Sequence, residues 1–166
     1  MDARTTSLGV VADGRLRLAQ WLALALPGAL LLGALGSQLI GGLVPCEMCM
    51  WQRWPHLVAI GFALLSFGAK RQARAAVWVA ALAIAVSGAI GVFHAGVEAG
   101  WWQGLTACST TAAGATPDEL LKSILATPLV RCDQVQWSFA GLSLAAWNAI
   151  ISLFSVGVIT WLTAKR

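Results

Sequence analysis

Four long apolar runs limit what this chain can fold into. They lie near residues 18–40, 50–69, 75–97 and 139–162, and a helix needs about 20 residues to cross the hydrocarbon core of a bilayer. Only 11% of the residues are charged, against about 25% in an average water-soluble domain. Such a domain could not cover its surface with so few charges. We therefore predict an all-α membrane protein, an antiparallel bundle of four transmembrane helices that forms one domain over 1–166.

The basic residues indicate how the helices are oriented. Lys and Arg in short loops stay in the cytoplasm, and the bases gather before the first run, between the second and third runs, and at the C-terminus. They are Arg4, Arg15, Arg17, Lys70, Arg71, Arg74, Lys165 and Arg166. Both termini are therefore expected in the cytoplasm, with outer loops near 41–49 and 98–138. The formal charge of +4 does not indicate nucleic acid, because no polar segment combines clustered bases with aromatic residues.

The first run follows basic residues, as a signal peptide does, but its apolar stretch exceeds the 7–15 residues typical of a signal core, which disfavours cleavage. The second run contains Pro55 near its start, and two interpretations stay open. Either a continuous helix begins near Met50 and Pro55 kinks it, or Pro55 is the first helical residue and 46–54 form an interfacial loop. Pro27 in the first run is expected to kink that helix.

All four cysteines fall on the outer side in this topology. Cys46 and Cys49 lie in the first outer loop, and Cys108 and Cys132 lie in the second. An oxidising outer compartment permits disulfides, so the cysteines are either redox-active or structural. A Cys-x-x-Cys pair closes a loop too short to restrict the unfolded chain much. The spacing of the first pair therefore favours a redox role.

The neighbours of the first pair support the redox interpretation. The motif lies at the outer, N-terminal end of the second helix, where the helix dipole favours a thiolate. Arg53 follows Cys49 by four residues, so both share one helical face. Its guanidinium can stabilise a Cys49 thiolate and donate to an anionic partner at membrane depth, although it can also extend toward lipid headgroups. Glu47 acts in the opposite sense, because a carboxylate raises the pKa of nearby thiols.

The second outer loop contains a short helix signal. Thr116 can cap a helix, Pro117 suits the first helical position, and Glu119 completes a capping box. The helix is too short to cross a membrane and ends before Pro128. We expect an amphipathic helix on the outer membrane surface, or packed against the bundle. Interfacial tryptophans, to which we assign no chemistry, are Trp101, Trp102 and Trp137.

The sequence resembles the DsbB family of bacterial inner-membrane disulfide-generating proteins. The resemblance rests on three motifs together with the four runs, and covers nearly the whole chain. These motifs are Pro45-Cys46-Glu47-Met48-Cys49-Met50-Trp51-Gln52-Arg53, the Cys108 and Cys132 pair, and the segment from Cys132-Asp133-Gln134 through Trp137-Ser138-Phe139-Ala140-Gly141-Leu142. Pro55 is less expected in this pattern.

The resemblance implies a disulfide relay in the inner membrane that re-oxidises a periplasmic DsbA-type thiol oxidase and reduces a membrane quinone, ubiquinone or menaquinone. It implies that Cys108 forms the mixed disulfide with the partner and that Cys132 is its pair. Cys132 then attacks Cys46, which releases Cys49 as a thiolate against the quinone, assisted by Arg53. DsbA lies near −120 mV, so its electron acceptor must be more oxidising than glutathione-range couples.

Other interpretations compete with this one. His94 and Glu98 could manage quinone protons, but a buried histidine satisfied by the backbone or by Glu98 is favoured. A vitamin K epoxide reductase-like enzyme carries its active Cys-x-x-Cys later in the chain, so the early position of Cys46 and Cys49 favours the DsbB family. A copper-handling membrane protein could use Cys46, Met48, Cys49 and Met50 as soft ligands, but helical spacing scatters them. A purely structural four-helix module would keep its cysteines inertly paired.

Overall fold

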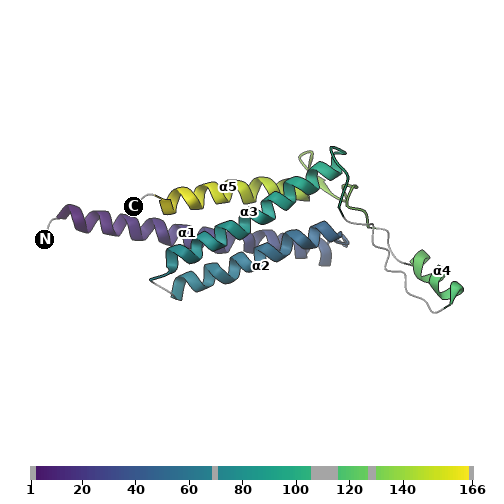
Figure 1. Ribbon diagram of the computed structural model, residues 1–166, viewed down its shortest axis with the longest axis horizontal. Coiled ribbons are helices and arrows are strands. Elements are labelled where there is room, and N and C mark those ends of the chain that lie inside the picture. The colour runs from purple at the N-terminus through teal and green to yellow at the C-terminus, as the bar shows by residue number, and fades with distance from the viewer. Residues whose placement is uncertain (1–2, 69–70, 106–115, 127–129, 165–166) are drawn as a thin grey trace.

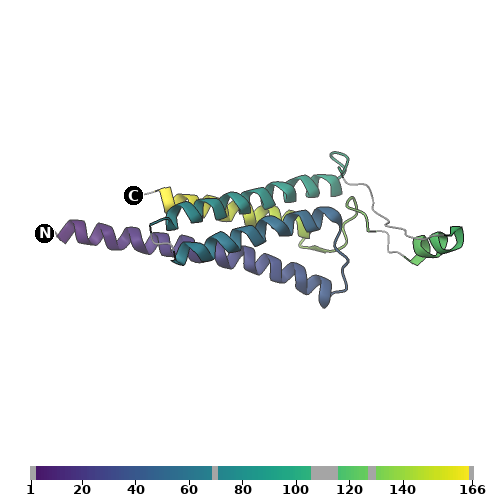
Figure 2. The same ribbon diagram turned by 60° about the horizontal axis from the view of Figure 1, so that its bottom comes forward.

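The computed structural model describes residues 3–68, 71–105, 116–126 and 130–164. Four long helices run side by side (Figure 1), and they are α1 (Ala3–Leu39), α2 (Glu47–Gly68), α3 (Ala73–Glu98) and α5 (Leu144–Ala164). The N-terminus, the C-terminus, the end of α2 and the start of α3 lie at one end of this bundle (Figures 1 and 2). We call this the inner end and the opposite one the outer end. Five of the eight bases listed above, Arg4, Arg15, Arg17, Arg71 and Arg74, belong to described segments at this end, and Lys70, Lys165 and Arg166 lie outside the described residues.

Three of the helices are long and apolar enough to cross a membrane, over Gly14–Leu39, Ala73–Glu98 and Leu144–Ala164. With its 22 residues, α2 is about 33 Å long at a rise of 1.5 Å per residue. It is therefore long enough to cross, but Glu47, Gln52, Arg53 and His56 make it more polar than the three spans just named. The fourth membrane span stays a prediction.

The structure decides between the two interpretations of Pro55. The second helix begins at Glu47, and Pro55 lies inside it as the ninth residue. The alternative in which 46–54 form a loop is therefore wrong, and Cys49 belongs to the first turn of the helix and not to the loop before it. Pro27 likewise lies inside the first helix, which begins far ahead of the predicted span.

The predicted start of the last span was wrong by five residues. A two-stranded hairpin precedes the helix, with β1 (Ser138–Phe139) paired antiparallel to β2 (Leu142–Ser143). Ala140 and Gly141 join the strands with φ of 52° and 78°, the positive values that a two-residue turn between twisted strands requires. Ser143 then caps α5, since its Oγ accepts a hydrogen bond from the Ala146 N–H at 3.1 Å.

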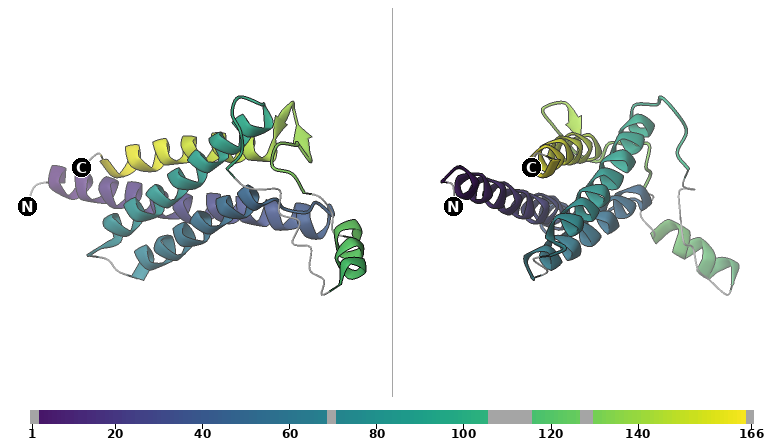
Figure 3. Two further views of the ribbon diagram at one scale, coloured as in Figure 1. Left: turned by 45° about the vertical axis from the view of Figure 1, so that its right-hand side comes forward. Right: turned by 60° about the vertical axis from the view of Figure 1, so that its left-hand side comes forward.

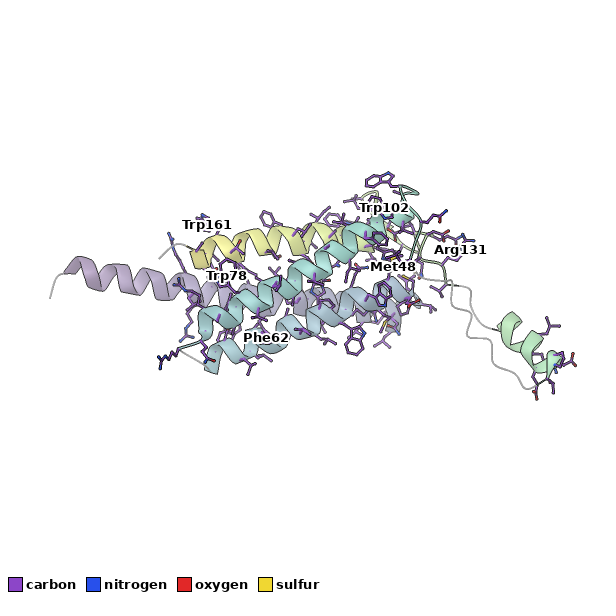
Figure 4. All side chains as sticks on the ribbon, in the orientation of Figure 1. Met48, Phe62, Trp78, Trp102, Arg131 and Trp161 are labelled. Atoms are coloured by element: carbon purple, nitrogen blue, oxygen red, sulfur yellow. The ribbon has the colours of Figure 1, made fainter. Side chains whose placement is uncertain are left out.

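The inner half of the bundle is held together by small apolar residues. Its buried cluster contains few side chains larger than Val, so the helix backbones can approach closely, as is common in membrane bundles. The members are Ala19, Ala23, Ala59, Ala63, Val77, Ala80, Ala81, Ile84, Ile159 and Leu162. Larger aromatic residues sit around this end, where Figure 4 labels Trp78 and Trp161. Arg15 lies over the Trp161 ring, 5.7 Å from its centroid.

At the outer end, the chain folds back on α3. Gly100 has φ of 72°, and the Trp101 N–H donates to the Gly96 carbonyl. The Trp102 ring then stacks on Phe93 with centroids 5.7 Å apart, and its Nε1–H donates to the Phe93 carbonyl at 2.8 Å. A Cβ at Gly96 would lie 2.1 Å from this ring, so the position needs glycine. Trp102 is thus fixed to the helix that precedes the long outer loop.

The short helix α4 (Pro117–Ala126) lies within the predicted outer loop. Its capping box is confirmed: the Glu119 N–H donates to Thr116 Oγ1, and the Thr116 N–H donates to a Glu119 carboxylate oxygen. Figures 1 and 2 draw α4 apart from the four long helices, beyond the outer end, and Figure 3 shows it again at this end. Its contact with a membrane surface stays a prediction.

Candidate active site

Cys46 begins the second helix. Its carbonyl accepts the Met50 N–H at 3.1 Å, and its Sγ accepts the Cys49 N–H at 3.2 Å. A residue whose carbonyl closes the first helical turn while its side chain accepts from the third helical N–H occupies the N-cap position. The sulfur of Cys46 therefore takes the place that a Ser or Thr oxygen usually fills. This geometry places Cys49 in the first turn, on the positive end of the helix dipole.

The sulfurs of Cys46 and Cys49 are 2.8 Å apart, so a small movement joins them in a disulfide. Cys46 is 3% exposed, and its hydrogen bond to Cys49 together with burial raises its pKa. Cys49 lies just before the predicted span at 50–69. The hydrogen bond from Cys46 lowers the pKa of the Cys49 thiol to about 7. Cys49 is therefore the sulfur that ionises, and Cys46 keeps the shared proton.

Cys132 lies next to this pair. It is buried and packs in one cluster with Cys46, Met48 and Val97, at the outer end where Figure 4 labels Met48. Beside it, the Arg131 guanidinium pairs with the Asp133 carboxylate, and Arg131 lowers the pKa of that carboxyl. The structure thus brings together three of the four predicted cysteines. Cys108, the fourth, lies outside the described residues.

Arg53 is tied to the first helix. Its guanidinium donates to Gln38 Oε1 at 2.8 Å and to the Ala34 carbonyl at 3.2 Å. A guanidinium has five N–H donors, so these two bonds leave others to point elsewhere. Arg53 and Cys49 line the same cavity, as the shared helical face predicted.

The cavity has a volume of about 650 Å³, within the range of small-molecule sites. Alanines, leucines and a glycine of α1 form its apolar wall. Its polar groups lie toward the outer end, and they include Cys46, Cys49, Gln52, Arg53, His94, Glu98 and Asn148. This combination fits a quinone, which has an apolar ring and two carbonyl acceptors. Arg53 would hold one carbonyl, and Cys49 would face the ring.

His94 is 2% exposed and lies between several partners. Its Nε2 is 3.6 Å from Cys46 Sγ and 3.8 Å from Glu98 Oε1, and its ring is also hydrogen-bonded to the main chain of Cys132. Glu98 in turn accepts a short hydrogen bond from the Ser143 hydroxyl. The expectation of a histidine paired with Glu98 or the backbone thus matches its contacts. Its role toward a quinone stays a prediction.

A buried polar network behind the cysteines was missed in the sequence. It joins α2, α3 and α5 in the outer half of the bundle, and its members are Gln52, His56, Ser87, His94 and Asn148. The signal was available, because Gln52 and His56 are four residues apart inside an apolar run, as are Asn148 and Ser152. Polar residues at helical spacing within a membrane run face the bundle interior. Among the described residues, His56 Nδ1 is a buried polar atom with no hydrogen-bond partner.

Metal binding can be judged from the same contacts. The ligand atoms of Cys46, Cys49 and His94 lie within 4.8 Å of one another, and thiolates with imidazole suit soft or borderline metal ions. The Gln52 amide, however, donates to His94 Nδ1 at 2.9 Å, which leaves the ring proton on Nε2, the nitrogen that faces the sulfurs. A protonated nitrogen cannot coordinate a metal. The arrangement therefore favours thiol chemistry over a metal centre.

Residues 16–162 match the family model described as disulfide bond formation protein DsbB. The match covers most of the chain, so this protein belongs to the DsbB family, whose members form disulfide bonds at the membrane. The chain is a multi-pass membrane protein with oxidoreductase chemistry. No curated protein sequence and no solved structure was found to match it.

Proposed function

We propose that this DsbB-family protein re-oxidises a DsbA-type periplasmic thiol oxidase and passes two electrons to a membrane quinone, ubiquinone or menaquinone. The electrons travel from Cys108 and Cys132 to Cys46 and Cys49. The observation that carries the proposal is the position of the Cys46–Cys49 pair. One side of the pair faces Cys132, and the other faces the cavity that Arg53 also lines.

The relay begins with three exchanges, starting from the Cys46–Cys49 and Cys108–Cys132 disulfides. A partner thiolate attacks Cys108, which forms a mixed disulfide and releases Cys132 as a thiolate. Cys132 attacks Cys46, so their sulfurs join and Cys49 leaves as a thiolate. The second partner thiolate attacks the mixed disulfide, and the partner departs oxidised. Each exchange breaks one S–S bond and forms another.

The remaining steps restore the enzyme. Cys108, now a thiolate, attacks Cys132 and releases Cys46. Cys46 and Cys49 then close their disulfide and give up two electrons and two protons. A bound quinone supplies the two-electron, two-proton acceptor, and one more oxidising than DsbA at about −120 mV drives the cycle forward. Arg53 holds positive charge beside Cys49, which favours its thiolate.

The proposed topology places the outer end of the bundle in the periplasm of a bacterial inner membrane. In this topology all four long helices cross the membrane and both termini are cytoplasmic. The common position of the two chain ends supports it (Figure 1), as does the gathering of bases there. We further propose that α4 lies on the outer membrane surface, because its apolar residues follow helical spacing. Labelling of single cysteines placed at each helix end from either side of the membrane tests this topology.

The function is tested with purified protein, a reduced DsbA-type partner and either quinone, following the quinone absorbance. We expect the oxidised quinone to disappear only when the partner is reduced, and the Cys49→Ala variant to be inactive. If no thiol-dependent loss of quinone occurs with either quinone, the proposed function is wrong.

A further inference from the structure

Gln52 is the residue that contacts His94 from the side away from the cysteines. Its side chain is buried, and its amide nitrogen is 2.9 Å from His94 Nδ1 and 3.2 Å from the Met48 carbonyl oxygen. Its amide oxygen accepts from Asn148 Nδ2 at 2.7 Å. Gln52 therefore uses both amide hydrogens and its oxygen inside the bundle.

Two backbone carbonyls fix the orientation of these amides. Turning the Gln52 amide over would place its oxygen 3.2 Å from the Met48 carbonyl oxygen, two acceptors in contact. It would also place its nitrogen against Asn148 Nδ2, two donors in contact. Asn148 cannot turn to compensate, because its Nδ2 also lies 3.3 Å from the Ser87 carbonyl oxygen. An unmatched buried pair of this kind costs about 1–3 kcal/mol.

The fixed amide determines which nitrogen of His94 carries the proton. Because an amide nitrogen only donates, His94 Nδ1 must accept, and the proton of the neutral ring lies on Nε2. Nδ1 is already occupied by the Gln52 amide, so we assign the hydrogen bond between the His94 ring and the Cys132 main chain to Nε2–H. The same nitrogen is 3.6 Å from Cys46 Sγ. One N–H thus faces both cysteines that exchange electrons.

We propose that Gln52 is a positioning residue that keeps the ring proton of His94 on Nε2, where it holds the Cys132 main chain beside Cys46 and donates to the Cys46 thiolate. The inference rests on the proposed function for the order of the exchanges. The hydrogen bonds of the Gln52 side chain go to Met48, His94 and Asn148, and Gln52 acts on the cysteines through His94.

The donated hydrogen bond matters in the step in which Cys46 is the leaving group. The Cys108 thiolate attacks Cys132 Sγ, the Cys108–Cys132 bond forms, and the Cys132–Cys46 bond breaks. The electron pair of the broken bond stays on Cys46. A thiolate that is better stabilised leaves faster, and an N–H donor stabilises the charged form of the sulfur. With the proton on Nδ1, a lone pair would face the departing thiolate instead.

Nitrogen NMR of the ¹⁵N-histidine-labelled protein tests the tautomer directly. The chain has only two histidines, and the signals that disappear in the His94→Gln variant belong to His94. We expect an unprotonated Nδ1 in the parent. In the Gln52→Glu variant a carboxylate accepts from Nδ1, so Nδ1 should become protonated. Gln72→Glu, the same change at an exposed residue near the inner end, should leave His94 unchanged. A protonated Nδ1 in the parent, or an unprotonated Nδ1 in Gln52→Glu, overturns the proposal.

The second part of the proposal, that the His94 hydrogen bond speeds the release of the Cys46 thiolate, is tested without quinone or partner. In a Cys49→Ala background the Cys46–Cys132 disulfide is prepared, and the appearance of the Cys46 thiol on attack by Cys108 is followed by rapid alkylation and mass spectrometry. Adding Gln52→Met, which lacks the donor, should slow this release about threefold, whereas Gln72→Glu should not. An unchanged rate in Gln52→Met overturns this half. Because neither measurement requires turnover, failure of the proposed function would appear separately, as absence of quinone reduction.

Discussion

The two halves of the bundle differ in how far they rely on hydrogen bonds between helices. In the inner half, Ala, Val, Ile and Leu fill most of the space between helices, and the Gln20 side chain donates a hydrogen bond to the Ser66 carbonyl of the neighbouring helix at 2.8 Å. In the outer half, Gln52, Ser87 and Asn148 connect three helices through directed hydrogen bonds. Close packing tolerates changes that conserve volume, whereas a buried hydrogen bond demands a particular partner. The inner half can thus supply stability while the outer half fixes the orientation of individual atoms.

The sharpest test of this division is the loss of a reacting atom in the outer half. We expect Cys132→Ala to reduce quinone turnover to background, because Cys46 then receives no electrons. Mixed with the oxidised partner, it should also accumulate a mixed disulfide, because the Cys108 thiolate attacks the partner disulfide and no Cys132 thiol is present to displace the partner. Non-reducing electrophoresis and peptide mapping of the adduct measure both effects.

Ser66→Ala is the matched control, because this buried hydroxyl donates only to the Ala63 carbonyl in its own helix and lies in the inner half. It should turn over normally. An adduct that runs through Cys46 or Cys49 would contradict the assignment of Cys108.

Arg53 gives the next largest effect. We expect Arg53→Ala to lower quinone turnover by about 10–100-fold while exchange between the partner and the loop cysteines continues, since that exchange takes place outside the cavity. Arg53→Lys keeps the charge but loses the planar fork, so its defect should be partial. Steady-state quinone reduction at several quinone concentrations separates the two variants. Parent-like turnover in Arg53→Ala would show that Arg53 only connects α2 to α1 and does not assist quinone reduction.

The pH dependence of Cys49 gives an intermediate effect. Its pKa of about 7 arises chiefly from the Cys46 hydrogen bond, so the reduced parent should alkylate at Cys49 half-maximally near pH 7. Cys46→Ala removes the donor, the thiolate loses its stabilisation, and the profile should move toward the ordinary value of 9.0.

Alkylation rates from pH 5 to 10, resolved by mass spectrometry, measure this change. Cys46→Ser keeps a hydroxyl donor and should lie between the two profiles. Coincident profiles for the parent and Cys46→Ala would show that Cys46 does not control the ionisation of Cys49.

The smallest effect is expected from packing in the inner half. Ala80 is fully buried, and Ala80→Leu should destabilise the bundle by about 1–3 kcal/mol through overpacking. The thermal transition in detergent should fall, while turnover per folded molecule stays within about twofold. Leu82→Ala, on the same helix but 65% exposed, is the control and should leave the transition nearly unchanged. A turnover loss in Ala80→Leu that exceeds its folded fraction would argue against two separable halves.

Much of this molecule follows from its sequence. The apolar runs locate all four long helices, and the Thr116 and Glu119 spacing locates α4. The start of α5 did not follow, because the Ala140 of the hairpin turn is a poor signal for positive φ. The partners of Arg53 and Gln52 did not follow either. They depend on how each helix is rotated about its axis, and helical periodicity gives the faces of a helix without saying which neighbour each face meets.

Because Trp102 is stacked on Phe93, the chain that follows it can reach only a limited distance from the outer end of α3. Cys108 follows Trp102 by six positions in the sequence, and a fully extended chain spans about 3.4 Å per residue. However the intervening chain folds, the Cys108 backbone stays within about 20 Å of Trp102. A partner must bring its reactive cysteine inside that radius, close to the outer end of α3. Lengthening the segment after Trp102 would extend this radius without touching any reacting group.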